Sequence, residues 1–188
     1  MKFCTINQSL RRALGAAIWL APCVAIAGPP RVMGPKNVPL SAPMAAPAAD
    51  FIQGGKPVPL SMFNGKKLMI WQVATWCGSC QAGLKMFERQ RALIDHSDLT
   101  VLVLRDYKNG GYPGATIQRF VQGAAPGLLH DPHFVFGDAS KTLNQLYNPH
   151  HYVDIYDLIT PGGKIAAQSS APSATFGKIK AFIAAPSS

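Results

Sequence analysis

The chain has 188 residues, of which 48% are hydrophobic and 14% are charged, and its formal net charge is +9. This length suits one domain of ordinary size plus a short extra segment, and the hydrophobic content is too high for a disordered chain. No apolar run reaches the roughly 18 residues that a membrane span needs. The basic residues form no block with interleaved aromatic residues, so we expect no nucleic-acid partner.

Residues 1–27 have the pattern of a secretory signal peptide. The first twelve residues carry three basic side chains and no acid, residues 13–27 are apolar, and the segment ends Ala25-Ile26-Ala27. A positive start, a short apolar middle and an A-x-A exit are typical of a cleaved signal peptide. We therefore expect a periplasmic protein with no stable membrane anchor after cleavage. The alternative is that the segment stays in place as an anchor.

The mature chain is predicted to consist of a linker and one domain. Residues 28–49 contain six prolines among alanines, glycines and methionines. Such spacing blocks both helix formation and strand pairing, which predicts a flexible Pro/Ala-rich linker without contacts to the core. The folded domain is predicted at residues 50–188.

Strands and helices are predicted to alternate in this domain. The predicted strands are residues 67–75, 100–104, 152–160 and 164–169, with a turn at 161–163 between the last two. The predicted helices are residues 79–94, 116–122, 139–147 (started by Asp138) and 173–184. Alternation of this kind predicts an α/β fold with helices on both faces of one sheet.

One motif carries reactive chemistry. Removal of residues 1–27 would leave Cys77 and Cys80 as the remaining cysteines, in the segment WCGSC where a strand ends and a helix begins. Cysteines at positions i and i+3 lie on one helix face and can close a small disulfide ring. Cys77 at the helix N-terminus would be favoured as a thiolate, and the shielded Cys80 would resolve a mixed disulfide. The alternatives are a structural disulfide or half of a zinc site, which lacks a well-spaced second ligand pair.

The segment ATWCGSC after a hydrophobic strand resembles the thioredoxin superfamily. Upstream, ADFIQGGKPVPLSMFNGKK resembles the opening hairpin of its periplasmic TlpA/ResA-like branch, and downstream YDLITPGGKI resembles that branch's closing hairpin. The resemblance covers residues 50–184. It implies a thioredoxin-like fold, with a central mixed sheet flanked by helices and an added N-terminal β-hairpin. It also implies a thiol:disulfide oxidoreductase that needs no cofactor beyond its own disulfide, with protein dithiol clients and a redox partner protein.

The resemblance also assigns roles to residues. It implies that Cys77 is the attacking thiol and Cys80 the resolving thiol, with Trp76 as the aromatic residue of the client groove. The rest of the groove would be formed by Gly78, Ser79, Val153 and Asp154.

Three positions depart from the family pattern. The cis-proline that usually faces the sulfurs falls on Asp154, for which we expect a trans peptide bond. Pro149, five residues earlier, is the alternative occupant through a shifted loop. The usual helix proline is replaced by Lys85, and the usual buried acid before the motif is replaced by Trp71.

Two further functions stay open. The segment HHYVDIYDLITPGGKI also resembles the copper-binding SCO branch, which would use the set Cys77, Cys80, His150 and His151 in a metallochaperone, although that branch has CxxxC. A degenerate thioredoxin-fold binding module that keeps the disulfide is the other alternative. We favour the oxidoreductase. A reductant role is expected because Gly78-Ser79 lacks the histidine of DsbA-like oxidants.

Overall fold

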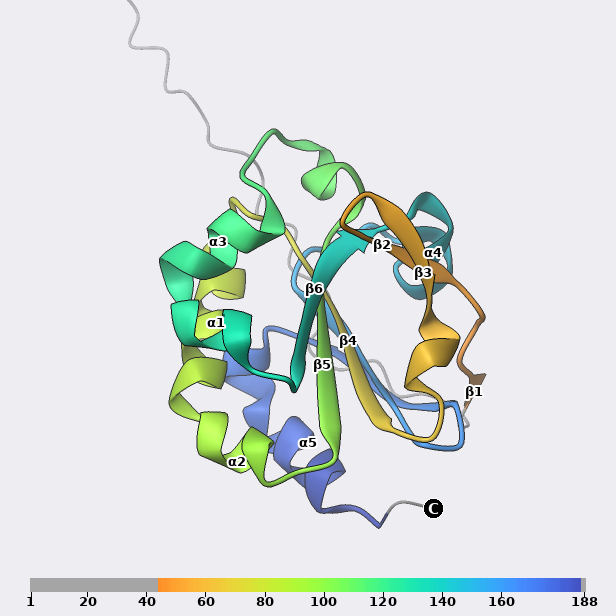
Figure 1. Cartoon of the computed structure of the whole chain (residues 1–188). Helices are drawn as coiled ribbons and strands as arrows, with labels where there is room; N and C mark the ends of the chain where they lie inside the picture. Colours follow the sequence, from red (N-terminus) through yellow and green to blue (C-terminus); the bar gives the residue numbers. More distant parts are fainter. Residues whose placement is uncertain (1–43, 187–188) are drawn as a thin grey trace, which may run out of the picture. The chain divides into compact units, whose positions relative to one another are not determined.

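The computed structural model describes residues 44–186 (Figure 1). The predicted signal peptide and residues 28–43 of the predicted linker lie outside this part of the chain. The strands are β1 (Met44–Ala45), β2 (Asp50–Gln53), β3 (Lys56–Pro59), β4 (Lys67–Val73), β5 (Leu99–Arg105), β6 (Phe134–Ala139), β7 (Ile155–Ile159) and β8 (Lys164–Ser170). The helices are α1 (Gly78–Arg89), α2 (Arg91–Asp95), α3 (Ile117–Ala124), α4 (Lys141–Tyr147) and α5 (Pro172–Ala184), with short 3₁₀ helices η1 (Leu60–Phe63), η2 (Tyr107–Gly111) and η3 (Pro126–His130). None of the helices in residues 44–186 is long and apolar enough to cross a bilayer.

The strands form one mixed sheet in the order β1-β8-β7-β4-β5-β6-β2-β3. β4, β5 and β6 are parallel to one another, whereas β7 runs antiparallel to β4. All seven residues of β4 are buried because both faces of the sheet are covered. Helices α1, α3 and α5 lie on one face, and α4 lies on the other (Figure 1). The predicted α/β architecture with helices on both faces is confirmed.

The predicted N-terminal hairpin is also present. β2 and β3 pair antiparallel through a two-residue turn at Gly54-Gly55, where both glycines have positive φ, of 58° and 77°. Two left-handed residues give a turn whose twist matches that of the strands. The hairpin extends the sheet because β2 pairs with β6. A Cβ on Gly137 of β6 would lie 2.6 Å from the carbonyl oxygen of Ile52, so glycine permits this close pairing.

The linker prediction is wrong for its last six residues. Met44 and Ala45 form β1, which pairs antiparallel with β8. The amide of Ala46 then donates to the carbonyl of Gly163 at 2.8 Å, and the Tyr147 hydroxyl donates to the carbonyl of Pro47 at 2.6 Å. Pro47 does not prevent this pairing, because it lies beyond the two residues of β1. The folded part of the described chain therefore begins before residue 50.

Three details of the predicted elements are corrected. β6 was missed, and it supplies the parallel strand beside β5. The helix predicted at 139–147 is capped by Ser140, whose hydroxyl accepts from the Leu143 amide, because Asp138 is used in β6 to bind Arg105. The helix predicted at 79–94 is broken at Gln90, whose amide donates to two carbonyls of the preceding turn.

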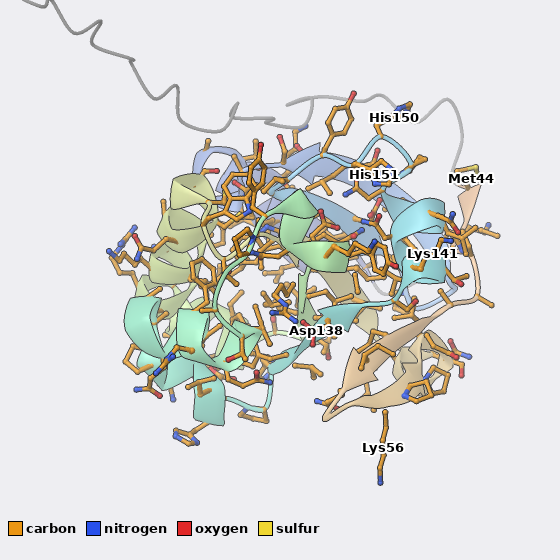
Figure 2. The ribbon with its side chains drawn as sticks, turned by 90° about the horizontal axis from the view of Figure 1, so that it is seen from above. Met44, Lys56, Asp138, Lys141, His150 and His151 are labelled. Carbon is orange, nitrogen blue, oxygen red and sulfur yellow. The ribbon has the colours of Figure 1, made fainter. Side chains whose placement is uncertain are left out.

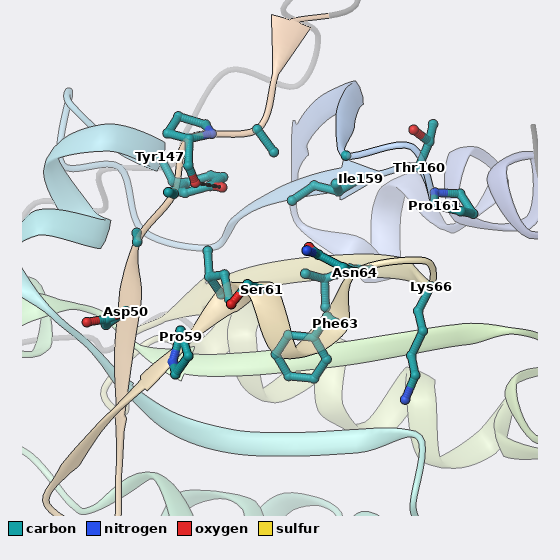
Figure 3. Close-up of a pocket in the computed structure, with 17 residues that line it drawn as sticks. Asp50, Pro59, Ser61, Phe63, Asn64, Lys66, Tyr147, Ile159, Thr160 and Pro161 are labelled. Carbon is teal, nitrogen blue, oxygen red and sulfur yellow. Dashed lines mark hydrogen bonds between the residues drawn. The ribbon is translucent and has the colours of Figure 1, made fainter.

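The described residues also form a pocket of about 260 Å³, which lies between the segment after β1, η1 and the β7–β8 turn (Figure 3). Its wall includes Phe63, Tyr147, Ile159 and Pro161. None of the residues predicted for the redox site or its groove lines this pocket. The pocket is therefore separate from the two cysteines.

Candidate redox site

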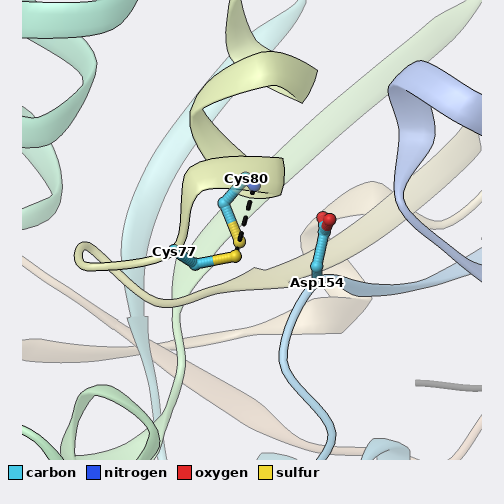
Figure 4. A group of neighbouring side chains, drawn as sticks. All are labelled: Cys77, Cys80 and Asp154. Atoms are coloured by element: carbon cyan, nitrogen blue, oxygen red, sulfur yellow. Dashed lines mark hydrogen bonds between the residues drawn. The ribbon is translucent and has the colours of Figure 1, made fainter. Parts of the chain in front are cut away.

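The dithiol sits in the turn that links β4 to α1. The amide of Cys77 donates to the carbonyl of Ala74 at 3.0 Å, which bends the chain after the strand. Cys77 is the N-cap of α1, and its Sγ accepts a hydrogen bond from the amide of Cys80 at 3.3 Å (Figure 4). The first turn of a helix leaves amide groups without partners inside the helix, and one of them here points at sulfur. The predicted placement of both cysteines is confirmed.

The two thiols have different surroundings. Cys77 is half-buried, and its Sγ lies 3.1 Å from the Ser79 hydroxyl. Hydrogen bonding from the Cys80 side chain lowers the pKa of Cys77 to about 7, together with Ser79 and against the effect of burial. Cys80 is fully buried, and burial raises its pKa well above the usual range. Cys77 is thus suited to attack as a thiolate, and Cys80 to wait as a protonated thiol.

The aromatic residue beside the dithiol is held by a loop that the sequence analysis did not identify. The indole Nε1 of Trp76 donates to the carbonyl of Asn109 at 2.8 Å, and its ring packs edge-on against Tyr112. The Asn109 side chain accepts from the amide of Thr75 at 2.8 Å and donates to the carbonyl of Tyr112 at 3.0 Å. Lys108 and Asn109 have left-handed φ values of 52° and 55°. One buried asparagine therefore fixes the turn in front of Cys77.

Asp154 lies beside the dithiol, directly before β7, and Val153 precedes it. The Asp154 amide donates to the carbonyl of Gln72, and its carbonyl accepts from the amide of Ala171. Every peptide bond in residues 44–186 is trans, so neither Asp154 nor Pro149 takes the place of a cis-proline. Asp154 instead has a left-handed φ of 67°. Val153 is buried, and its Cγ2 would lie 3.2 Å from a Cβ on Gly110.

The Asp154 carboxylate points back toward α1. Its Oδ1 accepts from the indole Nε1 of Trp71 at 2.9 Å, and its Oδ2 is buried without a hydrogen-bond partner. Burial raises the pKa of Asp154, whereas Ser79, Trp71 and Cys80 lower it. Trp71 itself lies under α1, where a Cβ on Gly83 would come within 2.6 Å of its ring. The indole fits because residue 83 is glycine.

The sulfurs of Cys77 and Cys80 and a carboxylate oxygen of Asp154 lie within 4.8 Å of one another. Within residues 44–186 this is the one group of three such donors with metal-binding spacing. His150 and His151 are not part of it, so the geometry does not support the copper set of two cysteines and a histidine.

His150 and His151, which are labelled in Figure 2, each make a contact of their own that does not involve the cysteines. His151 Nδ1 lies 3.1 Å from Oδ1 of Asn144, and the ring of His150 packs against Tyr152. Asn144 in turn donates to Gln72 and Asp106 in the interior. Burial raises the pKa of Asp106 to about 6. These contacts account for His151 without a metal.

Comparison with known proteins supports the fold. No protein-family model matches the chain, and no curated protein matches it in sequence. Among solved structures it is similar to a thioredoxin-like protein from Aeropyrum pernix, with a TM-score of 0.57, 16% identity, and coverage of 72% of this chain and 88% of that one. A thiol:disulfide interchange protein from Bacteroides sp. gives a TM-score of 0.55 at 16% identity, covering 78% and 92%. A secreted disulfide oxidoreductase of Mycobacterium tuberculosis gives 0.52 at 17%, covering 73% and 96%.

These likenesses establish a thioredoxin-like fold, as the sequence predicted. Because the sequence identities are low, these structural similarities support the fold but not the activity. The activity must follow from the residues of this site.

Proposed function

We propose that the protein is a periplasmic thiol:disulfide oxidoreductase that acts on protein clients through Cys77 and Cys80. The observation that carries the proposal is the contrast between the two thiols. Cys77 is half-buried at a helix N-terminus with a pKa of about 7, whereas Cys80 is fully buried with a raised pKa. Such a pair is suited to exchange, since an attacking thiolate must be accessible and a resolving thiol must be held in reserve.

The reaction in the reducing direction has two displacement steps. The Cys77 thiolate attacks one sulfur of a client disulfide, forming a mixed disulfide and releasing the other client sulfur as a thiolate. Cys80 then loses its proton and attacks Cys77 Sγ, which closes the Cys77–Cys80 disulfide and releases the second client thiolate. The two client thiolates take up protons. Two electrons have passed from the cysteine pair to the client, and a redox partner protein must return them.

Client docking is proposed to use the rim around Cys77. Trp76, held by Asn109, forms one side, and Val153 with the backbone of Asp154 forms the other. In this chain residue 154 is an aspartate instead of a proline. Its side chain is 1% exposed and accepts from Trp71, so the backbone of this residue, and not its carboxylate, would contact the client.

Compartment and direction each have their own support. The signal-peptide pattern of residues 1–27 and the secreted mycobacterial neighbour support export to the periplasm. A reductant role is supported by the glycine and serine between the cysteines, since a histidine there would stabilise the reduced form and make an oxidant.

The test is an exchange assay on the reduced full chain with insulin and with glutathione disulfide. We expect turnover that is lost in Cys77→Ser, and a reduction potential below about −250 mV from glutathione equilibration. A potential near −180 mV or above would instead assign oxidase or isomerase work. Absence of exchange by the unaltered protein would favour a binding module that only retains the disulfide.

A further inference from the structure

Two thiols of one turn and a carboxylate from a distant loop lie close together (Figure 4). Cys77 lies at the start of α1, Cys80 in its first turn, and Asp154 in the loop before β7. The two Sγ atoms and a carboxylate oxygen lie within 4.8 Å of one another. In a tetrahedral site with metal–sulfur bonds of about 2.3 Å and metal–oxygen bonds of about 2.1 Å, the ligand atoms are about 3.4 to 3.8 Å apart. Small side-chain rotations would bring the three donors to that spacing.

Hydrogen bonds hold the Asp154 carboxylate in place beside the two sulfurs. The backbone of Asp154 is fixed on both sides by hydrogen bonds to Gln72 and Ala171, and its Oδ1 is fixed by Trp71. Its Oδ2 is buried and makes no hydrogen bond. A buried oxygen without a partner is destabilising, so native proteins retain few of them and each needs an explanation. The Ser79 and Cys80 side chains lie next to the carboxylate, and Oδ2 would become a ligand once the Cys80 thiol gives up its proton.

The charge of the group points the same way. When both thiols are deprotonated, two thiolates and a carboxylate place three anionic donors within 4.8 Å of one another. A bound cation would offset their mutual repulsion. Two sulfurs and one oxygen exclude hard cations such as Mg²⁺ and Ca²⁺, which take oxygen ligands, and suit the borderline-soft Zn²⁺.

We propose that the reduced protein binds one Zn²⁺ through Cys77 Sγ, Cys80 Sγ and the Asp154 carboxylate. Water or a client thiol completes the tetrahedron at the exposed side of Cys77. Binding releases the thiol protons and moves no electrons. Zinc binding and the Cys77–Cys80 disulfide exclude each other, because the metal needs both sulfurs as thiolates and the disulfide bonds them to each other. Zinc would thus protect the reduced pair from oxidation and inhibit exchange.

The experiment titrates the phosphine-reduced full chain with Zn²⁺ against a chromophoric chelator, under nitrogen. Cd²⁺ in a parallel titration reports thiolate ligation by its sulfur-to-metal absorption. Cys4→Ser and Cys23→Ser are present in every sample, so that bound metal reports on Cys77 and Cys80. We expect one Zn²⁺ per reduced chain and none per oxidised chain. Failure of the reduced chain to bind Zn²⁺ overturns the proposal.

The role of the carboxylate is tested with Asp154→Asn, and Asp157→Asn serves as the matched control because Asp157 is a buried acid outside the group. We expect Asp154→Asn to weaken Zn²⁺ binding by at least about tenfold and the control to leave it unchanged. Equal affinity in all three proteins would mean that two cysteines alone hold the ion, which contradicts the three-donor site.

A further measurement needs no substitution at the site, so it remains valid even if Asp154→Asn fails to fold. X-ray absorption at the zinc edge is recorded on the zinc-bound chain in which Cys77, Cys80 and Asp154 are unaltered. We expect two sulfur scatterers with the remainder oxygen or nitrogen. Four sulfurs would indicate a metal shared between two chains and would overturn the proposal. Exchange measured in chelator-treated buffer tests the proposed function separately, since that function needs no metal and survives if zinc does not bind.

Discussion

The turn that carries the dithiol, residues 74–81, and the loop that faces it, residues 148–154, are built in different ways. The cysteines of the turn are held by contacts over a few residues, namely the amide of Cys77 on Ala74 and that of Cys80 on Cys77, while Asn109 fixes the residues just before them. The loop makes local hydrogen bonds at Asn148, but its last residue, which faces the sulfurs, is held by distant partners. Asp154 is fixed by Gln72, Trp71 and Ala171, and the trans backbone there is left-handed.

The difference shows which part of a redox site a short motif specifies. A strand, a C-x-x-C and a helix start are sufficient to place an attacking thiol on a helix N-terminus. What the thiol faces depends on a loop more than 70 residues further along the chain. The same dithiol can therefore work against a proline ring or a carboxylate, and substitutions in the turn and in the loop should have separable effects.

The largest expected effect is the selectivity between the two thiols of the turn. With a pKa of about 7, about half of Cys77 is thiolate at pH 7, whereas the raised pKa of Cys80 leaves below about 1%. Substoichiometric iodoacetamide followed by mass spectrometry should label Cys77 at least about 50-fold faster. The rate should rise with pH, with a midpoint near 7. Preferential labelling of Cys80 would reverse the assigned roles.

Next in size is the packing under the turn. Gly83→Ala places a Cβ 2.6 Å from the Trp71 ring, so we expect a loss of about 1–3 kcal/mol in the free energy of unfolding. Gly123→Ala in α3 is the control, since its Cβ meets nothing within 4 Å, and it should stabilise by up to about 1 kcal/mol. Thermal and urea unfolding measure both. Equal effects would show that the indole does not need glycine at residue 83.

Ser79→Ala tests how much the neighbouring hydroxyl stabilises the Cys77 thiolate. The Ser79 hydroxyl lies 3.1 Å from Cys77 Sγ and lowers the pKa of that thiol. Its removal should raise the pKa of Cys77, because the thiolate loses a donor, and should slow alkylation at pH 7 by about two- to tenfold. Above the pKa the two proteins should converge. An unchanged midpoint would leave the helix N-terminus and Cys80 as the main causes.

Asp154→Asn tests the facing loop in the opposite direction. The carboxylate is the smallest of the causes acting on Cys77, and it raises the pKa of that thiol by like-charge repulsion. The amide should lower the pKa and speed alkylation at pH 6 by less than about threefold in metal-free buffer. A slower reaction would mean that the carboxylate assists Cys77 instead of opposing its ionisation.

The smallest effect is expected from the histidines of the loop. His150→Ala with His151→Ala removes the contact to Asn144 and the ring packing on Tyr152, neither of which involves the sulfurs. Exchange with glutathione disulfide should change by less than about twofold, and stability by about 1 kcal/mol. Loss of exchange at unchanged stability would restore a direct role for these residues.

Local patterns explain what could be predicted. The run KLMIWQV gives β4, the C-x-x-C gives the start of α1, and Pro161-Gly162-Gly163 gives the last hairpin. β6 was missed because its segment FVFGDA is short and its second half contains Gly137 and Asp138, which are poor strand formers. Its partners Val101 and Phe51 lie far away in sequence, and only their pairing makes it a strand.

Within the site, the two cysteines and Asp154 could be placed from the sequence, and Asn109, Tyr112 and Gly83 could not. The dipeptide Asn109-Gly110 does signal a turn, because both residues adopt positive φ readily. No local pattern says that this turn lies against Trp76. From the sequence alone, Gly83 only lowers the helix propensity of its segment. Its role becomes clear from the structure, where the Trp71 ring lies against it.

The added hairpin also determines how the sheet ends. In a two-residue hairpin the closing pair, Gln53 and Lys56, is hydrogen-bonded, so Lys56 and Val58 direct their amides at β2. The outward positions of β3 are then Pro57 and Pro59, which have no N–H to offer. At the opposite edge β1 has two residues. Neither end of the described sheet presents a row of donors to a passing strand, so the sheet is protected from edge-to-edge pairing with other chains.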